Sequence, residues 1–282
     1  MLVNEAIAFA EQELKRSNNL NSRLDSEILV SHLINIPRES IYSKLKENLP
    51  SNKTEELQKL VSRRVKKEPI AYILNNKEFW STNFYVDRSV LIPRPETEVL
   101  IDLILSQINN KNNYFNILDI GTGSGCILVS LLKELTKAKG IGIDKSSKAI
   151  AVAKKNSISQ HVDSRSSFKN INLENIKFDK KFDLIVSNPP YLPDVSLKNL
   201  NLDIKLYEPK IALQGGVQGV DFLYKIIGLA SKILKINGLL ALEIGDNQFH
   251  ILAKYLNKNR FKILDKYILI NKQVRCLLAT KL

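Results

Sequence analysis

The sequence is poor in the residues that build disulfide frameworks and metal sites. Only two cysteines, Cys126 and Cys276, occur among 282 residues, and they lie far apart in the chain. This argues against a disulfide framework and fits a reducing compartment, so we expect a cytoplasmic protein. The three histidines are scattered, and no group of Cys and His residues has the spacing of metal ligands. The sequence therefore predicts no metal site.

Long apolar runs are also lacking. No stretch approaches the length that spans a bilayer, so no membrane partner is expected. The first residues include acids and lack a basic start with a small-residue cleavage site, so we expect no secretory signal. Hydrophobic residues make up 44% of the chain and charged residues 25%, which is ordinary for a globular protein. The length allows one large domain or two smaller ones.

Acidic residues are outnumbered by basic ones, and the formal net charge is +13. Such a charge can indicate a nucleic-acid partner. Residues 1–80 are nearly balanced, with 13 basic and 11 acidic residues, and residues 81–282 hold the other 29 and 18. The excess is spread along the second part, and an acidic protein or a ribosome would respond to the same field. Direct binding of nucleic acid is therefore the less favoured interpretation.

The spacing of apolar residues changes near residue 70. Residues 1–66 carry apolar positions three and four apart, which predicts helices. Residues 78–87 are aromatic and β-branched, which indicates a strand or hairpin. We expect a helical substrate-recognition domain over residues 1–72, a β-hairpin linker over 73–92 and a larger domain over 93–282.

Strands and helices alternate from residue 116 onward. Strands are predicted over residues 116–120, 140–144, 166–171, 182–187, 238–244, 261–269 and 274–280. Alternation of this kind implies right-handed crossovers and a mostly parallel sheet with helices on both faces. The last two strands have no helix between them, so they should form an antiparallel hairpin at one edge. The predicted fold class is α/β, with a seven-stranded sheet preceded by a small all-α domain.

A glycine-rich loop follows the first strand of this sheet, at residues 119–125. It has the form D-I-G-T-G-S-G, whereas a dinucleotide fingerprint is G-x-G-x-x-G and a P-loop is G-x-x-x-x-G-K-[ST]. The spacing counts against NAD and against ATP. Glycines let the backbone approach a ligand closely, and ligands of such sheets bind beyond the carboxyl ends of the strands.

The second strand ends at Asp144, 19 residues after Gly125. A carboxylate at this place can accept hydrogen bonds from both hydroxyls of a ribose. The site therefore favours a ribose and an uncrowded group beside the glycines, which S-adenosylmethionine provides. Asp119 would lie near the positive end of that cofactor. The alternative is that Asp144 only caps the helix that follows it.

The fourth strand runs directly into Asn188-Pro189-Pro190-Tyr191. The two prolines remove two backbone donors and restrict the residues before them, so the turn is stiff and extended. It would hold one polar side chain and one aromatic ring in fixed positions. By themselves these four residues fit an ordinary strand-ending loop equally well.

The glycine loop, Asp144 and N-P-P-Y together resemble the class I S-adenosylmethionine-dependent methyltransferases, which have a Rossmann-like fold. The resemblance is to members that methylate a planar, amide-like nitrogen in adenine, guanine or glutamine. Four further segments are similar to the PrmC/HemK family of protein-(glutamine-N5) methyltransferases of peptide-chain release factors: residues 63–80, 90–98, 207–216 and 242–245. The linker and P-R-P-E-T-E in residues 90–98 are the most specific part, because the nucleic-acid enzymes lack them.

The family resemblance implies methyl transfer to the glutamine of the Gly-Gly-Gln motif in class-1 release factors, with S-adenosylhomocysteine as the other product. A nucleic-acid amino-group methyltransferase, acting on adenine N6 or guanine N2, is the alternative enzyme. A module that binds the cofactor without chemistry is a third hypothesis, but it predicts damage to the motifs, and both are intact.

The resemblance also implies roles for individual residues. The expected catalytic residues are Asn188, Pro189 and Tyr191, because the Asn188 side-chain oxygen and the Pro189 carbonyl can accept both N–H groups of an amide while Tyr191 packs against it. The expected cofactor-binding residues are Asp119, Gly121, Thr122, Gly123, Ser124, Gly125, Asp144, Asn172, Leu173 and Asn188. The expected substrate-binding residues are Asn188, Pro189, Pro190, Tyr191, Arg94 and Glu96.

The chain departs from the family pattern at a few positions. Lys67 and either Asn75 or Asn76 stand where members usually carry glycine. Asn172-Leu173 stands where members usually carry Asp and a bulky residue beside the adenine. Asn can still accept a hydrogen bond there, but as a neutral group.

Overall fold

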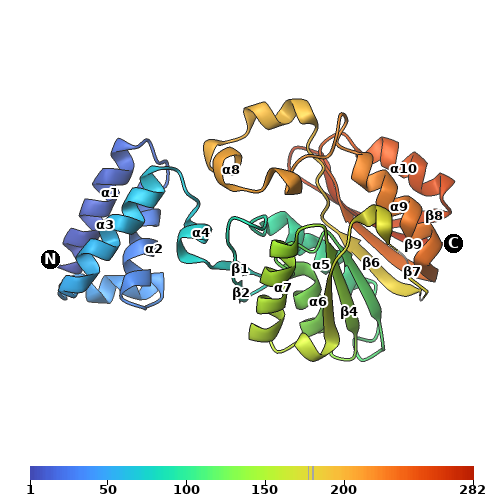
Figure 1. Ribbon diagram of the computed structural model, residues 1–282, viewed down its shortest axis with the longest axis horizontal. Coiled ribbons are helices and arrows are strands. Elements are labelled where there is room, and N and C mark those ends of the chain that lie inside the picture. Colours follow the sequence, from blue (N-terminus) through green and yellow to red (C-terminus); the bar gives the residue numbers. More distant parts are fainter. Residues whose placement is uncertain (177, 180) are drawn as a thin grey trace. The chain divides into compact units, whose positions relative to one another are not determined.

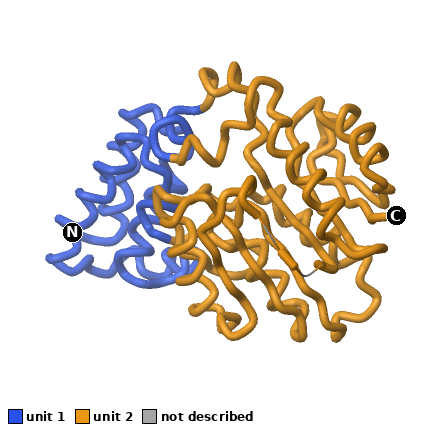
Figure 2. Tube along the Cα trace, turned by 45° about the vertical axis from the view of Figure 1, so that its right-hand side comes forward, with its two compact units in different colours: residues 1–75, 201–207 blue, residues 76–200, 208–282 orange. Residues whose placement is uncertain are grey.

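The structure is a computed structural model that describes residues 1–176, 178–179 and 181–282. The chain divides into two compact units, the first made of residues 1–75 with 201–207 and the second of residues 76–200 with 208–282 (Figure 2). The division differs from the expected domains in two ways. The expected linker is no separate part, because residues 76–92 belong to the second unit. Residues 201–207, expected in the larger domain, belong to the first.

The first unit consists of short helices, in agreement with the prediction for residues 1–66. They are α1 (Val3–Arg16), α2 (Ser22–Leu33), the 3₁₀ helix η1 (Arg38–Lys44), α3 (Ser51–Val65), α4 (Ile70–Leu74) and α8 (Leu202–Tyr207). Helix α1 buries one stripe of residues at helical spacing, namely Val3, Ala6, Ile7, Ala10 and Leu14. These side chains share a core with residues of α2 and α3 that include Leu29, Val30, Leu57 and Val61.

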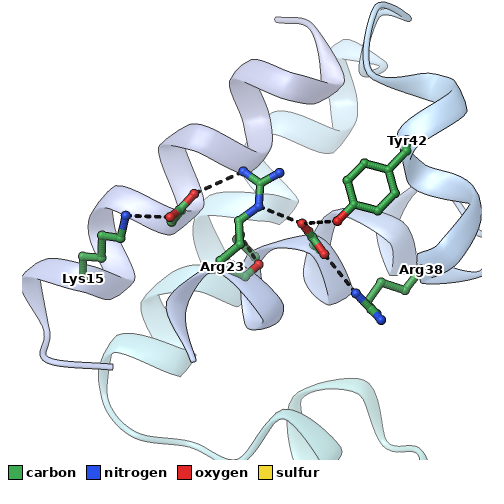
Figure 3. A network of polar contacts seen from close by, with 7 residues as sticks. Lys15, Arg23, Arg38 and Tyr42 are labelled. Atoms are coloured by element: carbon green, nitrogen blue, oxygen red, sulfur yellow. Dashed lines mark hydrogen bonds and ion pairs between the residues drawn. The ribbon is translucent and has the colours of Figure 1, made fainter. Parts of the chain in front are cut away.

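A polar network ties the first helices together (Figure 3). Buried Glu27 accepts hydrogen bonds from Arg23 Nε at 2.7 Å, Tyr42 OH at 2.9 Å and Arg38 NH1 at 3.1 Å. Arg23 also reaches Glu11, which pairs with Lys15. Burial opposes ionisation of Glu27, but the hydrogen bonds from Tyr42, Arg23 and Arg38 outweigh it and lower the pKa of Glu27.

The second unit contains the predicted seven-stranded sheet (Figure 1). Its strands are β3 (Asn116–Ile120), β4 (Lys139–Asp144), β5 (Ser166–Asn170), β6 (Phe182–Ser187), β7 (Leu234–Glu243), β8 (Phe261–Ile268) and β9 (Val274–Lys281), in the order β5-β4-β3-β6-β7-β9-β8. Strands β3 to β7 pair in parallel, and β9 is antiparallel to both β7 and β8. The predicted antiparallel hairpin at one edge is confirmed.

Helices cover both faces of this sheet. Helices α5 (Pro95–Ser106), α6 (Cys126–Glu134) and α7 (Ser147–Ser159) share one core with Ile117, Leu184 and Val186. Helices α9 (Asp221–Ile233) and α10 (Phe249–Lys258) share the other with Leu118 and Ile185. Neighbouring residues of one strand thus enter opposite cores, as the two-residue period of a strand requires. Since helices cover the two faces of the sheet, the carboxyl ends of its parallel strands are the place where a ligand site is expected.

A two-stranded hairpin precedes the sheet, formed by β1 (Lys77–Phe79) and β2 (Thr82–Phe84). Its turn residues, Trp80 and Ser81, both have positive φ, at 51° and 50°. A tight hairpin turn of this type normally uses Asn and Gly. Trp80 is held there because its backbone N–H donates to Glu98 and its ring Nε1 donates to Glu134, each at 3.0 Å.

Two of the positions where the family resemblance leads one to expect glycine have left-handed backbone. The φ angle is 69° at Lys67 and 51° at Asn75, whereas Asn76 is not among the residues with positive φ. Glycine adopts this region without strain, and other residues do so at a cost. Glycine would therefore relieve backbone strain at Lys67 and at Asn75.

No helix in the described part of the chain combines the length and the apolar character that crossing a membrane requires.

Candidate active site

A cavity of about 130 Å³ lies at the carboxyl ends of the parallel strands in the second unit. Its lining brings together ten of the residues predicted from the sequence: Gly121, Thr122, Gly123, Ser124, Asp144, Asn172, Leu173, Asn188, Pro189 and Pro190. The predicted cofactor loop and the N-P-P turn therefore face one space. Further lining comes from apolar residues that the sequence did not indicate, among them Val90, Phe222 and Ile226.

The glycine loop turns β3 into α6 through left-handed backbone. The φ angles of Gly121, Gly123 and Gly125 are 74°, 54° and 80°. A Cβ atom at Gly121 would meet nothing within 4 Å, and one at Gly123 would meet only the Gly121 carbonyl at 3.9 Å. Gly125 instead packs against Ala153, whose Cβ would lie 3.1 Å from an added Cβ. The first two glycines thus leave room for a ligand, and the third allows close packing.

Asp144 braces this loop and is half-buried at the end of β4. One carboxylate oxygen accepts from the backbone N–H of Gly123 at 3.0 Å, and the other from that of Ser146 at 2.9 Å. The cap of α7 is Ser146, whose hydroxyl accepts from Ala149 N–H. The alternative that Asp144 itself caps this helix is therefore wrong. Burial raises the pKa of the Asp144 carboxyl.

Asp119 lies behind the loop and is fully buried, so it is not part of the cavity wall. Thr122 donates its hydroxyl hydrogen to Asp119 Oδ2 at 2.7 Å, while Oδ1 makes no hydrogen bond with the described residues. Burial raises the pKa of Asp119 to about 7. A buried carboxylate oxygen that lacks a donor among the described residues, beside a loop with open space, fits a site that receives a cationic group.

The N-P-P-Y turn is held by polar contacts from other elements. The Asn188 side-chain Nδ2 donates to Thr97 Oγ1 at 3.1 Å. Tyr191 does not line the cavity, and its hydroxyl donates to Glu243 at 2.9 Å. Burial raises the pKa of Tyr191 far above its usual value, and the Glu243 carboxylate adds to the shift. The phenol therefore stays protonated and serves as an anchor.

Residues 213–219 brace the turn from its other side. Leu192 N–H donates to the Leu213 carbonyl at 3.0 Å, and Gly215 N–H donates to the Leu192 carbonyl at 2.9 Å. A Cβ at Gly215 would lie 2.8 Å from both the Pro190 carbonyl and Tyr191 Cα. Gln214, Gly215 and Gly216 belong to residues 207–216 of the family resemblance, and this segment thus supports the N-P-P-Y turn through its backbone.

The expected substrate residues Arg94 and Glu96 do not line the cavity. Arg94 forms an ion pair with buried Glu208, which also accepts from the backbone N–H of Ile92. Glu96 is exposed in the first turn of α5. Arg94 and Glu208 thus join the P-R-P-E-T-E segment to the chain before Pro209, another residue of the cavity wall.

Two polar residues of the site were not predicted as functional. Thr97 lines the cavity, and Glu243 lies directly behind it, with exposed fractions of 2% and 1%. Both belong to segments that carry the family resemblance, namely residues 90–98 and 242–245. Cys126 also lines the cavity, and burial raises the pKa of its thiol to about 12, which disfavours the reactive thiolate.

In residues 1–176, 178–179 and 181–282, no group of three or more His, Cys, Asp and Glu side chains is placed to hold a metal ion. The absence of a metal site stays a prediction.

Comparison with known proteins gives a consistent result over both units. Residues 5–74 match the family model of the PrmC N-terminal domain, and residues 111–273 match that of a methyltransferase domain. A release factor glutamine methyltransferase of Clostridium acetobutylicum is 35% identical over 258 residues, which cover 91% of this chain and 90% of that protein. A bifunctional methyltransferase of Rickettsia prowazekii is 41% identical over 253 residues, 83% of this chain and 49% of that protein. The chain spans about half the length of such Rickettsia relatives.

Solved structures agree on the fold. The crystal structure of a methyltransferase from Pyrococcus furiosus superposes with a TM-score of 0.52 at 16% identity, covering 81% of this chain and 98% of that one. At this identity the likeness shows a shared methyltransferase fold.

Proposed function

The chain belongs to the PrmC/HemK family, and from this membership we propose that it transfers a methyl group from S-adenosylmethionine to a protein glutamine. The acceptor is the N5 side-chain nitrogen of the glutamine in the Gly-Gly-Gln motif of class-1 release factors. The observation that carries the proposal is the shared cavity, whose wall contains both the glycine loop with Asp144 and the Asn188-Pro189-Pro190 turn. A donor site and an amide-binding site adjoin there.

The cofactor part of the proposal is supported by the chemistry of the wall. When bound, S-adenosylmethionine supplies a methyl group on a positively charged sulfur. Asp144 would accept hydrogen bonds from the ribose hydroxyls, and the open space at Gly121 and Gly123 would take the groups beside it. Asp119 would favour the cationic end through its buried negative charge.

The acceptor part follows from the properties of an amide. An amide nitrogen is a poor nucleophile because its lone pair is delocalised into the carbonyl. Two acceptors that receive both N–H groups hold the nitrogen in place and stabilise the positive charge that develops on it. Asn188 Oδ1 and the Pro189 carbonyl are the proposed pair. The rigid diproline turn keeps both in place, so little entropy is lost when the substrate binds.

Proton removal makes no special demand on the chain. The methylated amide carries a positive charge and loses its proton readily to water. A strong general base is therefore unnecessary, which is consistent with the absence of histidine among the cavity-lining residues of the described chain. We include a cytoplasmic location, independence from metals and no contact with membranes or nucleic acid in the proposal.

The test is methyl transfer from labelled S-adenosylmethionine to four acceptors in parallel. These are a class-1 release factor, the same factor with its Gly-Gly-Gln glutamine changed to alanine, duplex DNA and ribosomal RNA. We expect label on the unchanged factor alone. Label on DNA or RNA would replace the proposed function with the nucleic-acid alternative, and label on the alanine variant would show a different acceptor residue.

A further inference from the structure

A buried carboxylate lies directly behind the N-P-P-Y turn. Glu243 ends β7, and the parallel register pairs Leu242 with Ser187 of β6, so the next residues along the two strands, Glu243 and Asn188, end side by side. Glu243 is 1% exposed, and both of its oxygens accept hydrogen bonds. Oε1 accepts from the Tyr191 hydroxyl at 2.9 Å, and Oε2 accepts from the Thr97 hydroxyl at 2.6 Å.

Thr97 connects this carboxylate to Asn188. Its hydroxyl donates to Glu243 and accepts from Asn188 Nδ2 at 3.1 Å. A hydroxyl has one hydrogen to donate. Since Glu243 takes that hydrogen, Thr97 can only accept from Asn188, and the amide must present its NH₂ group to Thr97. Its Oδ1 is thereby left for another donor.

We propose that Glu243 and Thr97 are positioning residues, which fix the Asn188 amide so that Oδ1 and not Nδ2 faces the acceptor nitrogen. This inference rests on the proposed function, in which Asn188 must accept a hydrogen bond from a substrate N–H group. An amide in the opposite orientation would present two N–H donors to a nitrogen that is itself a donor. Such a turn lacks the acceptor that stabilises the positive charge developing on that nitrogen in the transition state.

The chemistry of Glu243 explains why a carboxylate occupies this place. Burial raises the pKa of Glu243, whereas the hydrogen bonds from Thr97 and Tyr191 and the charge of Arg275 favour its ionised form. In that form the carboxylate accepts at both oxygens, so it orders the hydroxyls of Thr97 and Tyr191 in one direction. A glutamine would carry a donor on one side. If the NH₂ group of this glutamine faced Thr97, it would donate a hydrogen bond to the Thr97 hydroxyl oxygen. The Thr97 hydroxyl hydrogen would then point to Asn188 and favour the amide orientation in which Oδ1 faces Thr97. The shape of the site would be unchanged, but the direction of the hydrogen bonds would be lost.

Tyr191 fixes the other end of the turn through the same carboxylate. Its backbone carbonyl accepts from Gln248 Nε2 at 2.9 Å, and Arg275 lies over its ring at 5.3 Å. The backbone and the ring of Tyr191 therefore have contacts that do not depend on Glu243. Glu243 thus orients the turn at both ends, through Thr97 at Asn188 and directly at Tyr191.

The first experiment compares Glu243→Gln with Glu134→Gln. Glu134 also accepts two side-chain hydrogen bonds, but it accepts them from Trp80 and Lys111 and not from residues of the site. We expect Glu243→Gln to lower kcat toward the release factor by at least about tenfold, because orientation of a reacting group is lost. KM for the factor and Kd for S-adenosylmethionine should stay within about threefold. The control should keep the native kcat. A native kcat in Glu243→Gln overturns the proposal, as does a loss confined to cofactor binding.

The hydrogen-bond chain from Glu243 through Thr97 to Asn188 forms a relay, and the second experiment distinguishes this relay from the packing of the Thr97 side chain. Thr97→Val keeps the shape without the hydroxyl and should lower kcat as strongly as Glu243→Gln, whereas Thr97→Ser should recover most of the activity. In the double variant Glu243→Gln/Thr97→Val, the two losses should not multiply, because both break the same relay. Fully multiplicative losses, or an inactive Thr97→Ser, would overturn the proposal.

A readout without any acceptor keeps this inference separate from the proposed function. In protein labelled with ¹⁵N-asparagine, the Asn188 side-chain NH₂ signal, assigned by its loss in Asn188→Ala, should exchange slowly with water. Glu243→Gln should accelerate that exchange at least about tenfold, and Glu134→Gln should not. Unchanged exchange overturns the relay. If the native chain transfers no methyl group to any release factor while the exchange result holds, the proposed function fails and the relay stands.

Discussion

At the level of single residues, Asn188 is the side chain on which the proposed transfer depends most directly. Asn188→Ala removes one of the two acceptors for the substrate amide and should abolish transfer, while Kd for S-adenosylmethionine changes by less than about tenfold. Single-turnover kinetics and calorimetry measure the two quantities. Asn259→Ala, just after α10, is a matched control, since that side chain donates locally to the Tyr255 carbonyl. Unchanged turnover in Asn188→Ala would exclude the assigned role.

Asp144 allows a second prediction at this level, because Asp144 braces the glycine loop whereas Ser146 caps the helix that follows. Asp144→Ala should weaken cofactor binding about 10- to 100-fold, since the ribose loses its acceptor and Gly123 loses its brace. Ser146→Ala should cost about 1 kcal/mol of stability as a lost helix cap, with Kd within about twofold. Calorimetry and thermal unfolding of both variants test this. Equal losses of affinity would contradict the distinction.

The residues of the site were predicted unevenly, for a physical reason. Glycines at fixed spacing and a diproline turn reveal their backbone conformation in the sequence, so ten residues of the cavity wall could be predicted. Thr97 and Glu243 carry no such signal. A threonine in the first turn of a helix and a glutamate at a strand end are common. The pairing of β6 with β7 brings Glu243 beside Asn188, and the packing of α5 brings Thr97 between them.

At the level of elements, the chain between α3 and α4 contains a non-glycine residue, Lys67, in left-handed backbone, a conformation that favours glycine. The φ angle of Lys67 is 69°. The variant Lys67→Gly should have a free energy of unfolding about 1 kcal/mol higher than Lys67→Ala, because both lose the lysine contacts and only glycine adopts this left-handed backbone without strain. Urea unfolding of Lys67→Gly and Lys67→Ala measures the difference. At exposed Gln58 inside α3 the order should reverse, with Ala more stable by about 1 kcal/mol. The same order at both positions would refute the explanation.

The strands of the sheet were predicted well because short apolar runs between helices mark buried strands in the sequence. β6 was placed residue for residue, and β7 begins at Leu234, earlier than the expected residue 238. The hairpin was expected, but its turn at Trp80 and Ser81 was not marked by Asn or Gly. That turn depends on the carboxylates of Glu98 and Glu134, which are distant in sequence.

At the level of the whole molecule, the chain enters the first unit twice. Residues 201–207 belong to it, although they follow the N-P-P-Y turn in sequence, and the Tyr207 hydroxyl donates to the Lys66 carbonyl at 2.7 Å. No local pattern distinguishes such a segment, because its membership arises from contacts between parts of the chain that are far apart in sequence. This is why the expected boundaries 72/73 and 92/93 describe the division only in part.

The two units should respond oppositely to mild acid. The pKa of Glu27 in the first unit is lowered, so the folded state loses stability as the pH falls below the unfolded value of about 4.5. The pKa of Asp119 in the second unit is raised to about 7, so the folded state takes up its proton first, and its contribution to stability rises as the pH falls from 7 towards 4. Hydrogen exchange resolved by segment, at about pH 7 and about pH 4, measures both.

Two variants isolate these contributions. Glu27→Gln should reduce the acid sensitivity of α1 to α3, and Asp119→Asn should flatten the pH dependence of the second unit between about 4 and about 7. An acid response of either unit that is the same with and without its carboxylate would show that another group is responsible.

Trp80 is the only tryptophan in the chain, and it lies in the hairpin turn of the second unit. Light at the long-wavelength edge of the protein absorption band therefore excites this one indole. The first unit, which contains no tryptophan, does not fluoresce under this excitation. The emission colour and lifetime of Trp80 depend on the Glu134 hydrogen bond and on the packing of the turn. The protein thus contains a built-in optical reporter, with which the melting of one unit can be followed without any label while the other unit is held native or already unfolded.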